Sequence, residues 1–98
     1  MVDATELAKM TVRFTKASIT VQLGRREMRA PKHADWFKAR LSQLEATRVS
    51  IKADLEALTN YPSPDVTSAN IHRAIATGTA ALEAVDAEIQ RSKKANRA

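Results

Sequence analysis

Large apolar residues recur at alternating spacings of four and three along two long stretches of this chain, and no other feature constrains its fold as strongly. In the stretch 34–59 the repeating positions are Phe37, Leu41, Leu44, Arg48, Ile51, Leu55 and Leu58, of which Arg48 alone is not apolar. In the stretch 66–93 they are Ile71, Ile75, Gly78, Leu82, Val85 and Ile89, where Gly78 takes the place of a large residue. Residues three or four apart lie on the same side of an α-helix, so each stretch is predicted to be helical with one continuous apolar stripe.

Two interruptions of this pattern, each containing proline, divide the chain into three segments. Pro31 lies in the first interruption, and Pro62 and Pro64 lie in the second. A residue that precedes proline is disfavoured in the helical region, so Tyr61 indicates the end of the second helix. A glycine within an apolar stripe, such as Gly78, is useful where an aromatic ring or another backbone must approach closely. The predicted segments are approximately 3–29, 34–59 and 66–93.

Residues 11–23, within the first segment, allow two interpretations. The segment follows the helical spacing through Leu7, Met10, Phe14, Ala17 and Val21. However, residues 11–14 and 19–23 are rich in β-branched residues and alternate with a period of two, which is the pattern of β-strands. Two such strands would form a β-hairpin, and the fold would then be α+β. A hairpin turn at 15–18 would normally contain Gly, Asn or Asp, and none is present. We therefore favour a helix and keep the hairpin as the alternative.

If the first segment is helical, it carries a second apolar stripe opposite the first, formed by Val12, Ile19 and Leu23. A helix with apolar residues on two opposite sides needs a neighbour on each side. Alanine supplies 18 of the apolar residues, which leaves few large side chains for the core of a chain this short. The second stripe therefore indicates self-association or a partner, and the alternative is that it packs within the monomer.

Three long helices joined by short connections predict an all-α fold. The 98 residues suit a single domain over 1–98. We expect an elongated three-helix bundle, or a helical hairpin with one further helix laid across it. The repeat of about 3.5 residues predicts coiled-coil-like packing with shallow crossing angles.

Positive charge is concentrated in two places along a chain whose net charge is +5. One is the segment 25–40, here called the hinge, and the other is 91–98, which is predicted to be a basic, frayed tail. Arginines beside an aromatic residue can bind phosphates and stack on a base, or they can contact an acidic protein surface. The simpler alternative is that the aromatic residues cap the core while the arginines are solvated. The hinge residues predicted to bind a partner are Arg25, Arg26, Arg29, Lys32 and Trp36.

The sequence offers little for catalysis. The absence of cysteine excludes disulfides, thiolate zinc sites and cysteine nucleophiles. His33 and His72 belong to different segments, and neither has a second histidine three or four residues away. No glycine-flanked nucleophile or phosphate-binding loop is present. We therefore predict no enzymatic activity, no catalytic residues, no cofactor and no metal.

The predicted function is that of a small helical protein-interaction or assembly module, such as an adaptor, an inhibitor or a structural component of a larger complex. Its partner would be another protein or a second copy of itself, with no membrane and no small-molecule substrate. The alternative is a protein associated with nucleic acid that contacts phosphates through the hinge and the C-terminal tail. The chain contains no apolar run of membrane-spanning length and no N-terminal signal segment, which predicts a cytoplasmic location. Small, basic, alanine-rich chains of this type are common in compact genomes such as those of phages, where the location would be the host cytoplasm or the virion.

Overall fold

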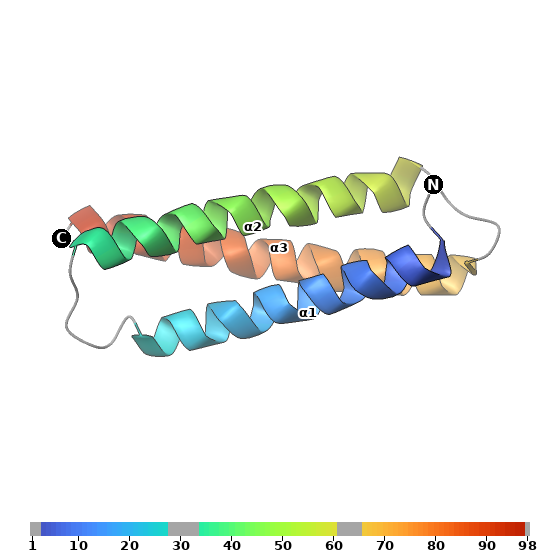
Figure 1. Cartoon of the computed structure of the whole chain (residues 1–98), viewed down its shortest axis with the longest axis horizontal. Coiled ribbons are helices and arrows are strands. Elements are labelled where there is room, and N and C mark those ends of the chain that lie inside the picture. Colours follow the sequence, from blue (N-terminus) through green and yellow to red (C-terminus); the bar gives the residue numbers. More distant parts are fainter. Residues whose placement is uncertain (1–2, 28–33, 61–65, 98) are drawn as a thin grey trace.

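Three long α-helices that pack side by side form the protein (Figure 1). The computed structural model describes the backbone of residues 3–27, 34–60 and 66–97 and the side chains of residues 3–26, 38–60 and 66–94. The helices are α1 (Ala4–Glu27), α2 (Ala34–Asn60) and α3 (Ser68–Arg97). Helices α1 and α3 run in the same direction and α2 runs in the opposite one, which gives an up-down-up bundle.

The bundle is an elongated rod with principal extents of 50 × 19 × 17 Å. Both α1 and α2 pack mainly against α3, and they contact each other much less. The buried core runs along the rod between the three helices, and its largest fully buried apolar side chains are Phe14, Leu44, Ile51, Leu58, Val21 and Val85. Every one of these residues except Val21 and Phe14 belongs to the two regular stripes of 34–59 and 66–93, so the all-α bundle predicted from those stripes is confirmed.

The alternative of a β-hairpin at residues 11–23 is wrong, because the whole segment lies within α1 and no strand occurs in the described ranges. Met10, Phe14, Ala17 and Val21 are buried on one side of α1, and only a helix presents all four to the same core. The β-branched threonines are accommodated because their hydroxyls donate to backbone carbonyls four residues earlier. These bonds are Thr11 to Leu7 at 2.8 Å, Thr15 to Thr11 at 3.0 Å and Thr20 to Lys16 at 2.9 Å.

Side-chain caps define where α1 and α3 begin. Asp3 Oδ1 accepts a hydrogen bond from the Glu6 backbone N–H at 2.8 Å, and Thr67 Oγ1 accepts one from the Asn70 N–H at 3.3 Å. Each bond satisfies an N–H group that has no partner within its own helix.

At the other end of α3, the sequence predicts a frayed tail from residue 91, whereas the helix continues to Arg97. Ile89 and Ser92 are both buried against the bundle. The tertiary contacts of these two residues therefore extend the helix beyond the point where the apolar pattern ends.

Gly78 lies where the ring of Phe14 and the side chain of Leu55 meet α3. A Cβ atom added at Gly78 would come within 2.7 Å of Leu55 Cδ2 and 2.9 Å of Phe14 Cε2. The predicted use of this glycine, to admit an aromatic ring close to the backbone, is confirmed. The absence of a side chain at position 78 allows α1 and α2 to approach α3 at the same level of the rod.

Candidate interaction surface

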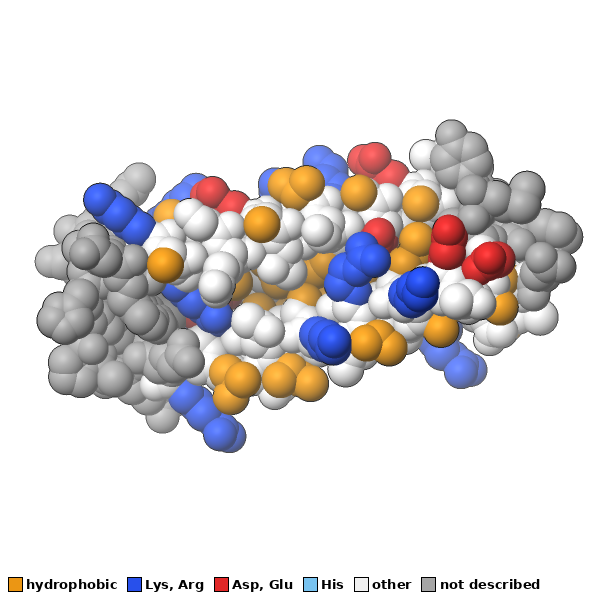
Figure 2. Space-filling model, viewed as in Figure 1, with side chains coloured by type: hydrophobic (Ala, Val, Ile, Leu, Met, Phe, Trp, Pro, Cys, Tyr) orange, Lys and Arg blue, Asp and Glu red, His pale blue; other side chains and the backbone are white. Residues whose placement is uncertain are grey.

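The second apolar stripe lies on the outer side of α1, opposite the residues that α1 contributes to the core. Val12, Ile19 and Leu23 are exposed to 52%, 50% and 51%, so they lie on the surface of the molecule. Hydrophobic side chains are visible along this exposed edge of α1 in Figure 2, with Lys or Arg side chains beside them. We call these three residues the outer stripe. Val49 of α2, at 66%, is the only other large apolar side chain among the described residues that is exposed to this degree.

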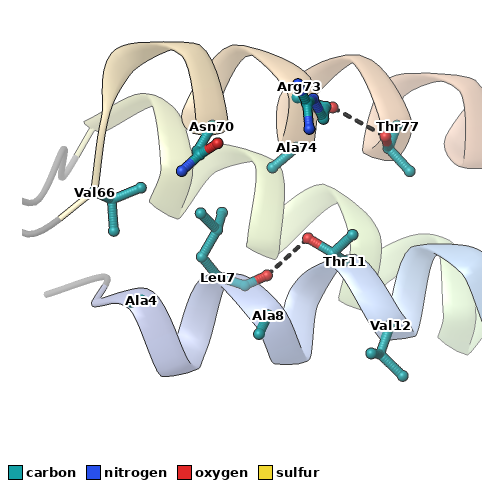
Figure 3. Close-up of a pocket in the computed structure, with 10 residues that line it drawn as sticks. All are labelled: Ala4, Leu7, Ala8, Thr11, Val12, Val66, Asn70, Arg73, Ala74 and Thr77. Carbon is teal, nitrogen blue, oxygen red and sulfur yellow. Dashed lines mark hydrogen bonds between the residues drawn. The ribbon is translucent and has the colours of Figure 1, made fainter.

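Val12 also borders a shallow hollow of about 420 Å³ between α1 and α3 (Figure 3). Leu7, Val66 and Ala74 line it with apolar surface, and Arg73 lies at its rim on α3. The hydroxyls of Thr11 and Thr77, which also line the hollow, donate to carbonyls of their own helices at 2.8 and 2.9 Å. The hollow therefore extends the apolar surface from the outer stripe towards the beginning of α1.

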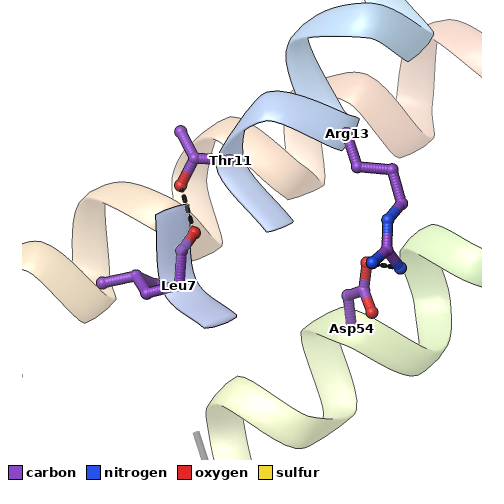
Figure 4. Close-up of polar contacts among 4 residues, drawn as sticks. All are labelled: Leu7, Thr11, Arg13 and Asp54. Atoms are coloured by element: carbon purple, nitrogen blue, oxygen red, sulfur yellow. Dashed lines mark hydrogen bonds and ion pairs between the residues drawn. The ribbon is translucent and has the colours of Figure 1, made fainter. Parts of the chain in front are cut away.

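Two arginines of α1 connect it to the other helices through ion pairs. Arg13 Nη1 lies 2.7 Å from Asp54 Oδ2 of α2 (Figure 4), and Arg25 Nε lies 3.4 Å from Glu88 Oε2 of α3. Burial raises the pKa of the Asp54 carboxyl above its ordinary value, because the loss of hydration outweighs the charge and the hydrogen bond of Arg13. The Glu88 side chain is fully buried, and Arg25, whose own side chain is partly exposed, supplies its opposite charge.

Three further cations of α1 lie beside the outer stripe on the surface. Lys9, Lys16 and Arg26 are exposed, and none of them forms an ion pair with another described residue. Between Leu7 and Arg26 the chain contains five cationic residues and no Asp or Glu. The outer side of α1 therefore combines an apolar line with uncompensated positive charge.

The predicted hinge residues have separate positions in the structure. Arg25 is engaged by Glu88, whereas Arg26 is exposed. Arg29 and Lys32 lie outside the described residues. Trp36 belongs to α2, but its side chain also lies outside the described part of the chain. The grouping of these five residues into one surface consequently stays a prediction.

Arg40 has a role that sequence reasoning missed, since the sequence pattern places it among the hinge cations. It is only 8% exposed, and its Nη2 donates to the Thr20 carbonyl oxygen at 2.7 Å. Gly24 makes this possible, because a Cβ atom at Gly24 would overlap the guanidinium of Arg40. The signal in the sequence was Gly24 itself, which occupies a position of the first apolar pattern that a large residue would otherwise fill.

Cations from all three helices meet at one end of the rod. The end of α1, the beginning of α2 and the end of α3 lie together there (Figure 1). Besides Arg25, which pairs with Glu88, the exposed cations described at this end are Arg26, Lys38, Arg91, Lys93 and Lys94. The fold thus brings the basic residues at the end of α3 close to those at the end of α1 and the beginning of α2. These residues are far apart in the sequence.

Within the described ranges, no group of three or more His, Cys, Asp or Glu residues is arranged to hold a metal ion. None of the helices, over the same ranges, has the length and apolar character needed to cross a membrane. The chain matches no protein-family model, and no curated protein or solved structure is significantly similar to it.

Proposed function

We propose that this protein is a small, non-enzymatic interaction module that binds another protein, or copies of itself, through the outer stripe of α1. The observation that carries the proposal is the line formed by Val12, Ile19 and Leu23, each about half exposed, on a helix whose opposite side is already packed in the core. Single exposed aliphatic residues are ordinary on protein surfaces. Three of them at helical spacing form the kind of apolar line that another helix covers.

The surrounding charge supports the same function. Lys9, Lys16 and Arg26 lie beside the outer stripe, and the predicted hinge residues Arg29, Lys32 and Trp36 follow α1 along the chain. Arginine and tryptophan are enriched among residues that dominate binding energy at protein interfaces. This description fits an adaptor, an inhibitor or a structural component of a larger complex. We propose that the protein acts in the cytoplasm, and a phage genome is one source that would suit it.

A charged substitution in the outer stripe tests the proposal. Ile19→Asp is expected to abolish self-association or partner binding and to change the midpoint of thermal unfolding by only a few degrees, because residue 19 is half exposed. Val49→Asp is the matched control, since it places the same charge at an exposed aliphatic position on α2. Light scattering would measure the mass in solution, and quantitative affinity purification would compare the partners of the two variants with those of the wild type.

Three results contradict the proposal. If Ile19→Asp unfolds the monomer, the stripe belongs to the core. If the wild-type chain is a monomer that binds no protein, or if both variants retain the same partners, the outer stripe is ordinary surface.

A protein that contacts nucleic acid is the alternative function, and it is favoured by the cluster of cations at one end of the rod. Arg26, Lys38, Lys93 and Lys94 come from three helices and are exposed together. Cations near the C-termini of α1 and α3 also complement the helix dipoles, which is the simpler explanation for part of this cluster.

Binding of labelled DNA and RNA at two salt concentrations tests this alternative. If several phosphates are contacted, the affinity should fall about tenfold or more for a few-fold rise in salt. Lys93→Glu combined with Lys94→Glu should remove the binding, whereas Lys52→Glu on α2 should not. No binding at low salt excludes this function.

A further inference from the structure

We propose that the partner of the outer stripe is an amphipathic helix that carries acidic residues beside its apolar line. This inference rests on the proposed function and specifies the chemistry of the partner. It follows from the charge, the spacing and the shape of the surface around Val12, Ile19 and Leu23.

The charge of α1 selects an acidic partner. From Leu7 to Arg26 there are five cationic residues and no acidic one. Arg13 and Arg25 are engaged by Asp54 and Glu88, which leaves Lys9, Lys16 and Arg26 exposed beside the outer stripe. A partner helix without acidic groups would cover the outer stripe but leave these three cations without an opposite charge from the partner. A partner helix with acidic groups would supply that charge.

A second copy of the chain fits this surface poorly. If two copies of α1 paired antiparallel with Val12 opposite Leu23 of the second copy, Lys9 would face Arg26 of that copy. If they paired in parallel, each cation would lie near the same cation of the other copy. Like charges placed opposite each other at an interface disfavour the pairing, so charge complementarity favours a different, acidic helix.

The spacing fixes where the acidic groups of the partner should lie. Val12, Ile19 and Leu23 follow a half-heptad pattern, and the distance from Val12 to Leu23 along the helix is about 17 Å at 1.5 Å per residue. Lys9 and Lys16 are seven residues apart, so they lie along the same edge of the stripe. A partner helix with Glu or Asp seven residues apart beside its apolar line would place both carboxylates against these lysines.

The hollow between α1 and α3 provides a site for one additional apolar side chain. It begins at Val12 and is lined by Leu7, Val66 and Ala74, with the exposed Arg73 at its rim. A partner helix that extends past Val12 towards Ala4 would therefore insert a large apolar residue beside a further cation. Its interface would continue from the outer stripe into this hollow.

A displayed library of helical peptides tests the proposal on the full-length protein. Each peptide would have about 20 residues, fixed leucines at half-heptad spacing and flanking positions that are Glu, Lys or Gln. The expected result is enrichment of Glu at flanking positions seven residues apart. The Glu peptide should bind about tenfold more tightly than its Lys counterpart at low salt, because several individually weak ion pairs add together. This preference should decrease as salt is raised.

Charge reversal on the protein provides the decisive control. Lys9→Glu combined with Lys16→Glu should reverse the preference, so that the Lys peptide binds more tightly than the Glu peptide. Lys52→Glu, an exposed position on α2, should leave the preference unchanged. Equal binding of the Glu and Lys peptides to the wild type, or an unchanged preference in the double variant, overturns the inference.

The remaining outcomes separate this inference from the proposed function. If the chain forms a dimer that Ile19→Asp dissociates, and no acidic peptide binds, the function stands and the acidic partner is wrong. If duplex DNA or vesicles containing phosphatidylserine bind more tightly than the Glu peptide, and Ile19→Asp abolishes that binding, the acidic helix is again wrong. If the chain stays monomeric and binds no peptide, DNA or vesicle, both proposals fail.

Discussion

Replacing Phe14 by alanine is expected to lower the free energy of unfolding by about 3–5 kcal/mol, the usual cost of removing a buried ring. Phe14 is fully buried and lies against Gly78, within a rod only 19 × 17 Å in cross-section. A core this narrow has few other side chains that can move in to fill the cavity. Urea unfolding followed by circular dichroism would measure the loss. A cost below about 1 kcal/mol would contradict the packing described here.

The contact between Phe14 and Gly78 provides an internal control for that measurement. Gly78→Ala improves helix propensity by about 1 kcal/mol but adds a Cβ atom 2.7 Å from Leu55 Cδ2 and 2.9 Å from Phe14 Cε2. In the Phe14→Leu background the contact with the ring is removed and the contact with Leu55 remains, so the same substitution should be less destabilising. The difference between the two backgrounds measures the coupling between positions 14 and 78.

Arg25→Ala is expected to destabilise the protein by about 3 kcal/mol, whereas Arg26→Ala should change the stability by less than about 0.5 kcal/mol. The two arginines are adjacent in the sequence, but only Arg25 contacts the fully buried carboxylate of Glu88. Among the described residues, Glu88 forms an ion pair with Arg25 alone, so removing Arg25 leaves that carboxylate without its partner, and a buried unpaired charge is strongly unfavourable. Equal effects of the two substitutions would show that the ion pair does not stabilise the fold.

Removing the other member of the pair should have a much smaller effect. In Glu88→Met, Arg25 remains 46% exposed at its side chain, so water can hydrate its charge. A methionine of similar length fills the space of the glutamate without the cost of burying a carboxylate. Stability is therefore expected to be unchanged or increased. Together, the three variants distinguish the cost of burying Glu88 from the contribution of its partner.

The helices could be predicted from the sequence because their apolar spacing directly reports which side faces a core. The predicted segments 34–59 and 66–93 correspond to Ala34–Asn60 and Ser68–Arg97, and 3–29 corresponds to Ala4–Glu27. The outer stripe follows from the same periodicity, since Val12, Ile19 and Leu23 must lie opposite the core once α1 is a helix. These are local properties, and they do not depend on how the helices are arranged in space.

The polar contacts could not be predicted, because they depend on the axial register of one helix against another. The separation of Arg25 and Glu88 by 63 residues gives no sign that they meet, and Arg40 resembles any other hinge cation until the fold places it against Gly24. The same limit explains the ambiguity at residues 11–23. Alternating β-branched residues favour a strand locally, whereas the burial of Phe14 and Val21 in the same core stabilises the helix.

In a bundle of three helices that run alternately up and down, the first helix begins at one end of the rod and the last helix ends at the other. Ala4, at the beginning of α1, and Arg97, at the end of α3, consequently lie at opposite ends of a molecule 50 Å long (Figure 1). Fluorescent reporters fused at the two ends would be held apart by roughly the length of the rod. In an assembly, the protein would act as a spacer that keeps anything joined before α1 far from anything joined after α3.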